Sequence, residues 1–115
     1  MPSVDLYKER ITKELQIAYA SRKQGNEGRA RVCARRAVGI ALTLFLESRN
    51  EPVKDQDAMD LLKRVQSIPV FPPELQQSAT RLTTRIGTDF QYTSNTDPIE
   101  DAKAIIEFIF KTITQ

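Results

Sequence analysis

The fold is decided largely by one stretch, residues 28–46, which reads GRARVCARRAVGIALTLFL. Its apolar residues recur with the 3.6-residue period of an α-helix, so we predict a helix over about residues 28–48. The predicted inward stripe consists of Ala30, Cys33, Ala37, Ile40, Ala41, Leu44 and Phe45. Three further apolar residues cover the opposite side of its second half: Val38, Leu42 and Leu46. A helix that is apolar all round is either central to a bundle or lies in an oligomer interface.

The sequence on both sides of this stretch is predicted to be helical as well. Residues 4–23 place Tyr7, Ile11, Leu15 and Ala18 on one face, and Gly25 suits a left-handed C-terminal cap. Further helices are expected over residues 57–66 with Asp55 as N-cap, from about residue 73 to near residue 87, and over residues 98–113 with Asp97 as N-cap. No alternating strand pattern occurs. We therefore predict one all-α domain over residues 1–115, an up-down four-helix bundle with one extra short helix.

Composition excludes more functions than it indicates. The 115 residues are 40% hydrophobic and 28% charged, which is typical of a globular domain. The chain has no histidine, which excludes Ser-His-Asp and Cys-His catalysis and histidine-ligated metal sites. The acidic cluster over residues 55–60 is explained by charges that cap a helix start, so no metal and no cofactor are expected. The sequence predicts no catalytic residue.

The same composition bears on the expected compartment. The longest run without a charge, residues 37–46, is too short to span a bilayer, and the first residues lack the pattern of a signal peptide. Cys33 is the only cysteine and falls on an apolar stripe, so we interpret it as a buried structural thiol. These features favour a cytoplasmic protein with no membrane contact.

The charges are unevenly distributed. Residues 22–36 contain six basic residues and one acid, whereas residues 89–101 contain four acids and no base. We interpret these stretches as two solvated surfaces of opposite sign, with an anion site at the basic end as the alternative. Guanidinium groups can hold phosphate through paired hydrogen bonds, but arginine is also a common exposed helix former. The candidate anion-binding or nucleic-acid-binding residues are Arg29, Arg31, Arg35, Arg36, Arg81 and Arg85.

Helical spacing sorts these candidates into pairs. Arg31 and Arg35 share one face, Arg29 and Arg36 share another, and Arg81 lies four residues before Arg85.

Residues 28–46 resemble the alanine-rich second helix of HEPN domains (higher eukaryotes and prokaryotes nucleotide-binding). The short helix over residues 57–66, the helix that opens with Pro73-Glu74-Leu75, and the Asp97-Pro98 start of the last helix are similar as well. The resemblance covers about residues 6–113 and depends on helix order and composition more than on an invariant motif.

Many members of that family are RNA-cleaving toxins, often paired with a nucleotidyltransferase antitoxin. Their site combines an arginine with a histidine a few residues later and is completed across a dimer. Arg85 stands at the matching arginine position, but Phe90, Gln91 and Tyr92 stand where the histidine would fall. The resemblance therefore implies a non-catalytic interaction or dimerisation module. It also implies a homodimer, in which Arg85 lies close to its symmetry mate and holds an anion, and a nucleotidyltransferase-like protein as a further partner. The alternative is a nucleotide- or RNA-binding module that uses the arginine surface.

Overall fold

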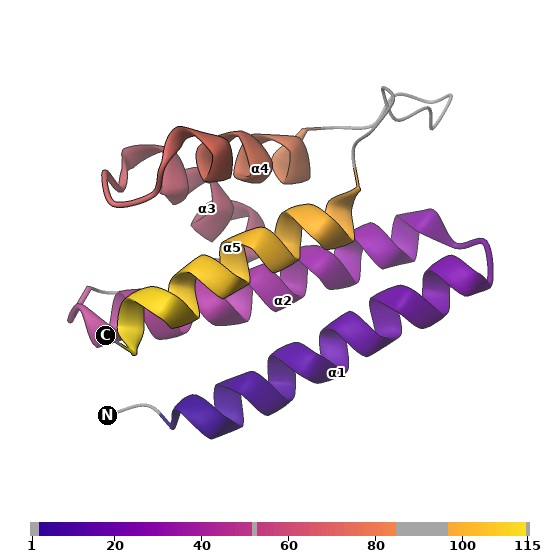
Figure 1. Cartoon of the computed structure of the whole chain (residues 1–115), viewed down its shortest axis with the longest axis horizontal. Helices are drawn as coiled ribbons and strands as arrows, with labels where there is room; N and C mark the ends of the chain where they lie inside the picture. The colour runs from indigo at the N-terminus through magenta and orange to yellow at the C-terminus, as the bar shows by residue number, and fades with distance from the viewer. Residues whose placement is uncertain (1–2, 52, 85–96, 115) are drawn as a thin grey trace.

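The computed structural model describes residues 3–51, 53–84 and 97–114 (Figure 1). These residues form five α-helices and one short 3₁₀ helix and contain no β-strand, so the all-α prediction is confirmed. None of these helices is both long enough and apolar enough to cross a bilayer. The helices, in chain order, are α1 (Val4–Lys23), α2 (Glu27–Ser48), α3 (Ala58–Arg64), η1 (Val65–Ser67), α4 (Pro73–Thr83) and α5 (Pro98–Ile113).

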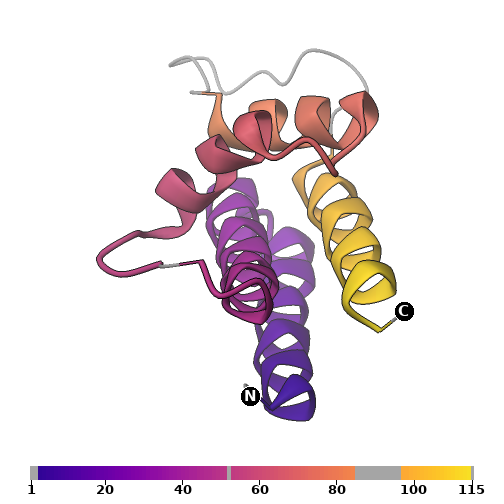
Figure 2. The ribbon, with the colours of Figure 1, turned by 90° about the vertical axis from the view of Figure 1, so that its left-hand side faces the viewer.

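Helix α2 is the centre of the molecule. It lies antiparallel to α1 and packs against α3 and α5, while α4 covers α5 on the side away from α1 (Figures 1 and 2). The other helices of this chain cover the second half of α2, which explains why that half is apolar on nearly all sides. Val38, Leu42 and Leu46 have no exposed surface. Of the two alternatives that the sequence left open, the central position is therefore the one that the structure shows.

Local sequence explains most helix ends. Ser3 caps α1 by accepting a hydrogen bond from the Leu6 amide, and Gly25, just past its end, has the predicted positive φ of 78°. Helix α2 begins one residue earlier than predicted because the side chain of Asn26 caps it. Asp97 is the N-cap of α5 as predicted, and its carboxylate accepts from the amides of Ile99 and Glu100.

Two predicted boundaries were wrong. The N-cap of α3 is Asp57 and not Asp55, because Asp57 and Asp60 form a reciprocal capping box, whereas Asp55 lies before the helix with a φ of 61°. Helix α4 ends at Thr83 instead of near residue 87, since the backbone of Thr84 is already extended. Arg85, Phe90, Gln91 and Tyr92 lie outside the described residues.

The core joins α2 to the other helices through large apolar side chains. The ring of Phe71 lies 5.3 Å from that of Phe45 and 5.1 Å from that of Phe108, measured between centroids. Cys33 is buried with 2% of its surface exposed, as a structural thiol should be. At Gly39 the backbone of α2 approaches α3 so closely that an added Cβ would lie 3.0 Å from the Cβ of Ala58.

Candidate functional site

The arginines of α2 divide into two groups with different surroundings. Arg31 and Arg35 extend toward the C-terminal end of α4. The Nη2 of Arg31 donates to the carbonyl oxygens of Arg81 and Thr84, both at 2.6 Å, and the Nε of Arg35 donates to the carbonyl of Leu82 at 2.6 Å. Arg31 is only 6% exposed. The sequence correctly placed both residues on one face, and the structure shows what that face contacts.

These contacts have a clear structural effect. The last carbonyl groups of a helix have no partner within the helix and carry the negative end of its dipole. Two guanidinium groups from α2 supply both the hydrogen bonds and the positive charge that this end of α4 requires. Arg31 and Arg35 therefore attach α4 to the centre of the fold.

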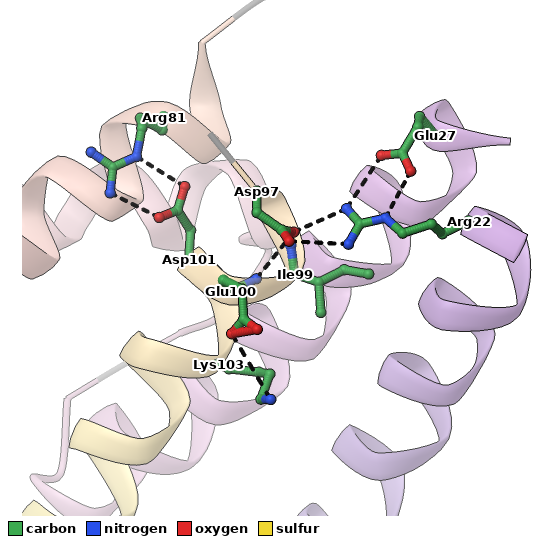
Figure 3. Close-up of polar contacts among 8 residues, drawn as sticks. All are labelled: Arg22, Glu27, Arg81, Asp97, Ile99, Glu100, Asp101 and Lys103. Carbon is green, nitrogen blue, oxygen red and sulfur yellow. Dashed lines mark hydrogen bonds and ion pairs between the residues drawn. The ribbon is translucent and has the colours of Figure 1, made fainter. Parts of the chain in front are cut away.

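Arg81 on α4, another of the candidate arginines, also has an internal partner. Its Nε and Nη2 form a paired contact with the carboxylate of Asp101 on α5, at 3.0 and 2.8 Å (Figure 3). Its Nη2 also donates to the hydroxyl of Ser78. The hydrogen bond with Asp101 raises the pKa of Arg81, so its guanidinium group stays charged. This contact joins α4 to α5.

Sequence reasoning missed a fourth arginine, Arg22 at the end of α1. Its guanidinium lies between two carboxylates: Nε donates to Glu27 at 2.7 Å and Nη2 donates to Asp97 at 2.9 Å (Figure 3). Hydrogen bonds with Glu27 and Asp97 raise the pKa of Arg22. The basic and acidic stretches are thus not simply two separate solvated surfaces, because they meet at this contact. The opposite charges of the two stretches were the sequence signal that could have predicted this contact.

Burial and hydrogen bonding shift the pKa of Asp97 in opposite directions. Burial by itself would raise the pKa of its carboxyl group, but hydrogen bonds from Arg22 and from the amides of Glu100 and Ile99 outweigh burial. The pKa of Asp97 consequently lies below its ordinary value. One carboxylate therefore caps α5 and also ties its start to the α1–α2 turn.

Arg29 and Arg36 belong to the second group and are exposed to solvent. Arg36 reaches Glu14 of α1 only at 3.9 Å, and its side chain is 62% exposed. Arg36 lines a cleft together with Arg10 of α1, a cation that sequence reasoning missed. Arg10 and Lys13 are exposed, and they follow Leu6 by four and seven residues, so the three side chains share one face of α1. We call this surface the outer face and define it as Leu6, Arg10, Lys13 and Ile17 of α1 with Arg29, Val32 and Arg36 of α2.

The outer face borders a cleft where α1, α2 and the start of α3 meet. The cleft has a volume of about 300 Å³. Its charged lining residues are Arg10, Glu14 and Arg36. The remaining lining residues are Gly39, Ile40, Thr43, Gln56, Ala58 and Leu61. Sequence reasoning did not indicate this cleft, because its residues come from three separate helical segments.

The structure thus places five of the six candidate arginines, in two different settings. It brings together Arg31, Arg35 and Arg81 around the end of α4, and it leaves Arg29 and Arg36 on the outer face. The sixth, Arg85, lies outside the described residues. Over the described ranges, no cluster of acidic or cysteine side chains is arranged to hold a metal ion.

Comparison with protein-family models, with curated proteins and with solved structures gives no match to this chain.

Proposed function

We propose that this chain is a divergent, non-catalytic protein of the HEPN type, an up-down four-helix bundle with one extra short helix, whose function is to bind another macromolecule. The family proposal is supported by the order of the helices, the alanine-rich α2 and the Asp97-Pro98 start of α5. The binding proposal has separate support from the structure.

The exposed apolar side chains of the outer face are the observation that carries the binding proposal. Leu6, Ile17 and Val32 are 54%, 38% and 42% exposed. By helical spacing, Leu6 and Ile17 share the face of α1 that carries Arg10 and Lys13. Val32 lies on the face of α2 that carries Arg29 and Arg36. Single exposed apolar residues are ordinary, but several on one face mark an interaction surface. A partner that covered them would gain about 25 cal/mol for each Å² of apolar surface removed from water.

Charge indicates what kind of partner fits this face. Four exposed cations, Arg10, Lys13, Arg29 and Arg36, stand against two nearby carboxylates, Glu9 and Glu14. A second copy that used the same face would bring cations against cations, whereas an acidic amphipathic helix would complement both the charge and the apolar residues. We therefore propose an acidic helical segment of a protein partner. The homodimer remains a prediction, and it would have to use a different surface.

Nucleic acid is the second candidate, because the same four cations could contact phosphates. Aliphatic side chains do not contribute to phosphate contacts, whereas a protein partner would bury them. The three exposed aliphatic residues therefore favour the protein partner over RNA or a nucleotide.

The test uses two fluorescently labelled probes, a synthetic acidic amphipathic helical peptide and a single-stranded RNA of similar charge, with binding followed by anisotropy. We expect the peptide to bind the wild-type chain and to bind the Leu6→Ser/Ile17→Ser/Val32→Ser variant at least tenfold more weakly. The Arg29→Gln/Arg36→Gln variant should also lose affinity. The matched control is Lys54→Gln/Lys63→Gln, which removes the same charge from exposed positions outside this face.

The outcomes separate the two candidates. RNA binding that falls steeply between about 50 and 200 mM salt, and that the serine substitutions leave unchanged, would favour the nucleic-acid function. Peptide binding that responds equally to the control variant would be non-specific attraction and would overturn the proposal. Light scattering at micromolar concentration tests the homodimer separately, since a strict monomer would make that prediction wrong.

A further inference from the structure

The cleft between α1, α2 and α3 contains charges of both signs that are poorly matched to each other. The Oε1 of Glu14 lies 3.9 Å from the Nη1 of Arg36, which is too far for a hydrogen bond. Its Oε2 is covered by surrounding atoms and has no hydrogen-bond partner among the residues described. A covered carboxylate oxygen without a donor is unfavourable and rare in native proteins. A ligand that supplied a positively charged donor would satisfy it.

The other side of the cleft is apolar. Leu61 is 3% exposed, and Ile40 and Ala58 are partly buried beside it. Thr43 donates its hydroxyl hydrogen to the carbonyl of Gly39 at 2.8 Å, so its oxygen remains able to accept. The cleft therefore combines two guanidinium groups, one carboxylate, a hydroxyl acceptor and an aliphatic wall.

We propose that this cleft binds a small zwitterion, an α-amino acid with an aliphatic side chain. Its carboxylate pairs with Arg10 and Arg36, its ammonium group donates to Glu14, and its side chain lies against Ile40 and Leu61. Because Oε2 of Glu14 is covered, the Glu14 side chain has to rotate toward the ligand. Arg36, which is 62% exposed, has the freedom to turn from Glu14 to the ligand carboxylate.

Size and charge favour this class over a nucleotide or a simple anion. A volume of about 300 Å³ is at the lower end of the range for small-molecule sites, which runs from roughly 300 to 1,000 Å³. A phosphate group alone would be attracted by the two arginines but repelled by Glu14. A zwitterion uses both signs of charge. Arg10 and Arg36 belong to both the cleft and the outer face, but binding of the zwitterion does not require the macromolecular partner proposed above.

Isothermal titration of the full chain with L-leucine tests the proposal, with three related probes for comparison. N-acetyl-L-leucine lacks the ammonium charge, L-leucinamide lacks the carboxylate, and inorganic phosphate carries only negative charge. We expect L-leucine to bind and to raise the melting temperature with concentration. N-acetyl-L-leucine and L-leucinamide should each bind at least tenfold more weakly. Absence of leucine binding at millimolar concentration, or equal binding of N-acetyl-L-leucine or phosphate, would overturn the proposal.

Variants assign the binding to this cleft. Glu14→Gln is nearly isosteric and removes the partner of the ammonium group, and Arg36→Gln removes one partner of the carboxylate. Each should weaken leucine binding at least tenfold, while Lys63→Gln, at an exposed position outside both the cleft lining and the outer face, should not change it. Circular dichroism confirms that each variant is folded. Leucine binding that is unchanged in folded Glu14→Gln would show that the ligand binds elsewhere and would reject this site.

Discussion

Arg35 and Arg36 are consecutive residues of α2, yet they belong to different parts of the molecule. Arg35 donates to the Leu82 carbonyl at the end of α4, whereas Arg36 is mostly exposed and reaches Glu14 only at 3.9 Å. Successive residues of a helix point about 100° apart, since a turn contains 3.6 residues. The arginine at position 35 therefore connects two helices, whereas the arginine at position 36 is a cation accessible to solvent.

The same difference separates the two groups to which these arginines belong. The internal group, Arg22, Arg31, Arg35 and Arg81, joins helices through carbonyl and carboxylate oxygens. The outer face carries its cations next to solvent and beside exposed aliphatic residues. Stability measurements should separate the two groups, because among the described residues the internal group makes side-chain hydrogen bonds between helices and the cations of the outer face do not.

The largest effect is expected for Arg31→Met. Methionine keeps an unbranched stem but leaves two carbonyl oxygens at the end of α4 without these donors. Hydrogen bonds that involve a charged group contribute about 1.5–3 kcal/mol each, so we expect unfolding free energy to fall by about 2–4 kcal/mol. Urea denaturation followed by circular dichroism measures it. A loss below about 0.5 kcal/mol would show that the contacts do not hold α4.

A smaller effect is expected at Asp97. Replacement by alanine removes both the cap of α5 and the pair with Arg22, and should cost about 1–2 kcal/mol. Asparagine can still cap the helix, so Asp97→Asn removes mainly the pair with Arg22. Comparing the two variants in the same urea experiment separates the contributions.

The lowered pKa of Asp97 fixes how this contribution depends on pH. A carboxyl group whose pKa is lower in the folded state than in the unfolded state stabilises the fold when the pH is above the unfolded pKa, which is about 4 for aspartate. That stability is lost as the pH falls through the folded pKa. The unfolding free energy of the wild type should therefore exceed that of Asp97→Asn by a constant amount between about pH 5 and about pH 7. This difference should shrink below about pH 4. An advantage that grew on acidification would contradict the assignment.

The pair between Arg81 and Asp101 should have a still smaller coupling. The Arg81 side chain is 40% exposed and that of Asp101 is 11% exposed, so water screens the interaction in part. A double-mutant cycle with Arg81→Met and Asp101→Asn should give a coupling of about 0.5–1 kcal/mol. A coupling near zero would mean that this pair does not help to hold α4 against α5.

The smallest effect is expected on the outer face. Arg29→Gln/Arg36→Gln should change the unfolding free energy by no more than about 0.5 kcal/mol, because both side chains are exposed. The same variant should weaken peptide binding. If it instead destabilised the fold as strongly as Arg31→Met, the distinction between the two groups would fail.

The sequence by itself determined the helices, because apolar periodicity and capping residues act within a few residues of each other. The stripe of α2, the positive φ at Gly25 and the cap at Asp97 all follow from local spacing. The error at Asp55 is also local, since Asp57 and Asp60 stand three residues apart and form the box that the sequence pattern allows. Helical spacing likewise placed Arg31 with Arg35 and Arg29 with Arg36.

Only the tertiary structure decided what each of those faces meets. The partners of Arg31 lie 50 and 53 residues further along the chain, and Asp97 lies 75 residues from Arg22. The cleft likewise combines side chains from α1, α2 and the start of α3. Spacing along one helix fixes the direction of a side chain, but its partner depends on how separate helices pack, and packing is a property of the whole core.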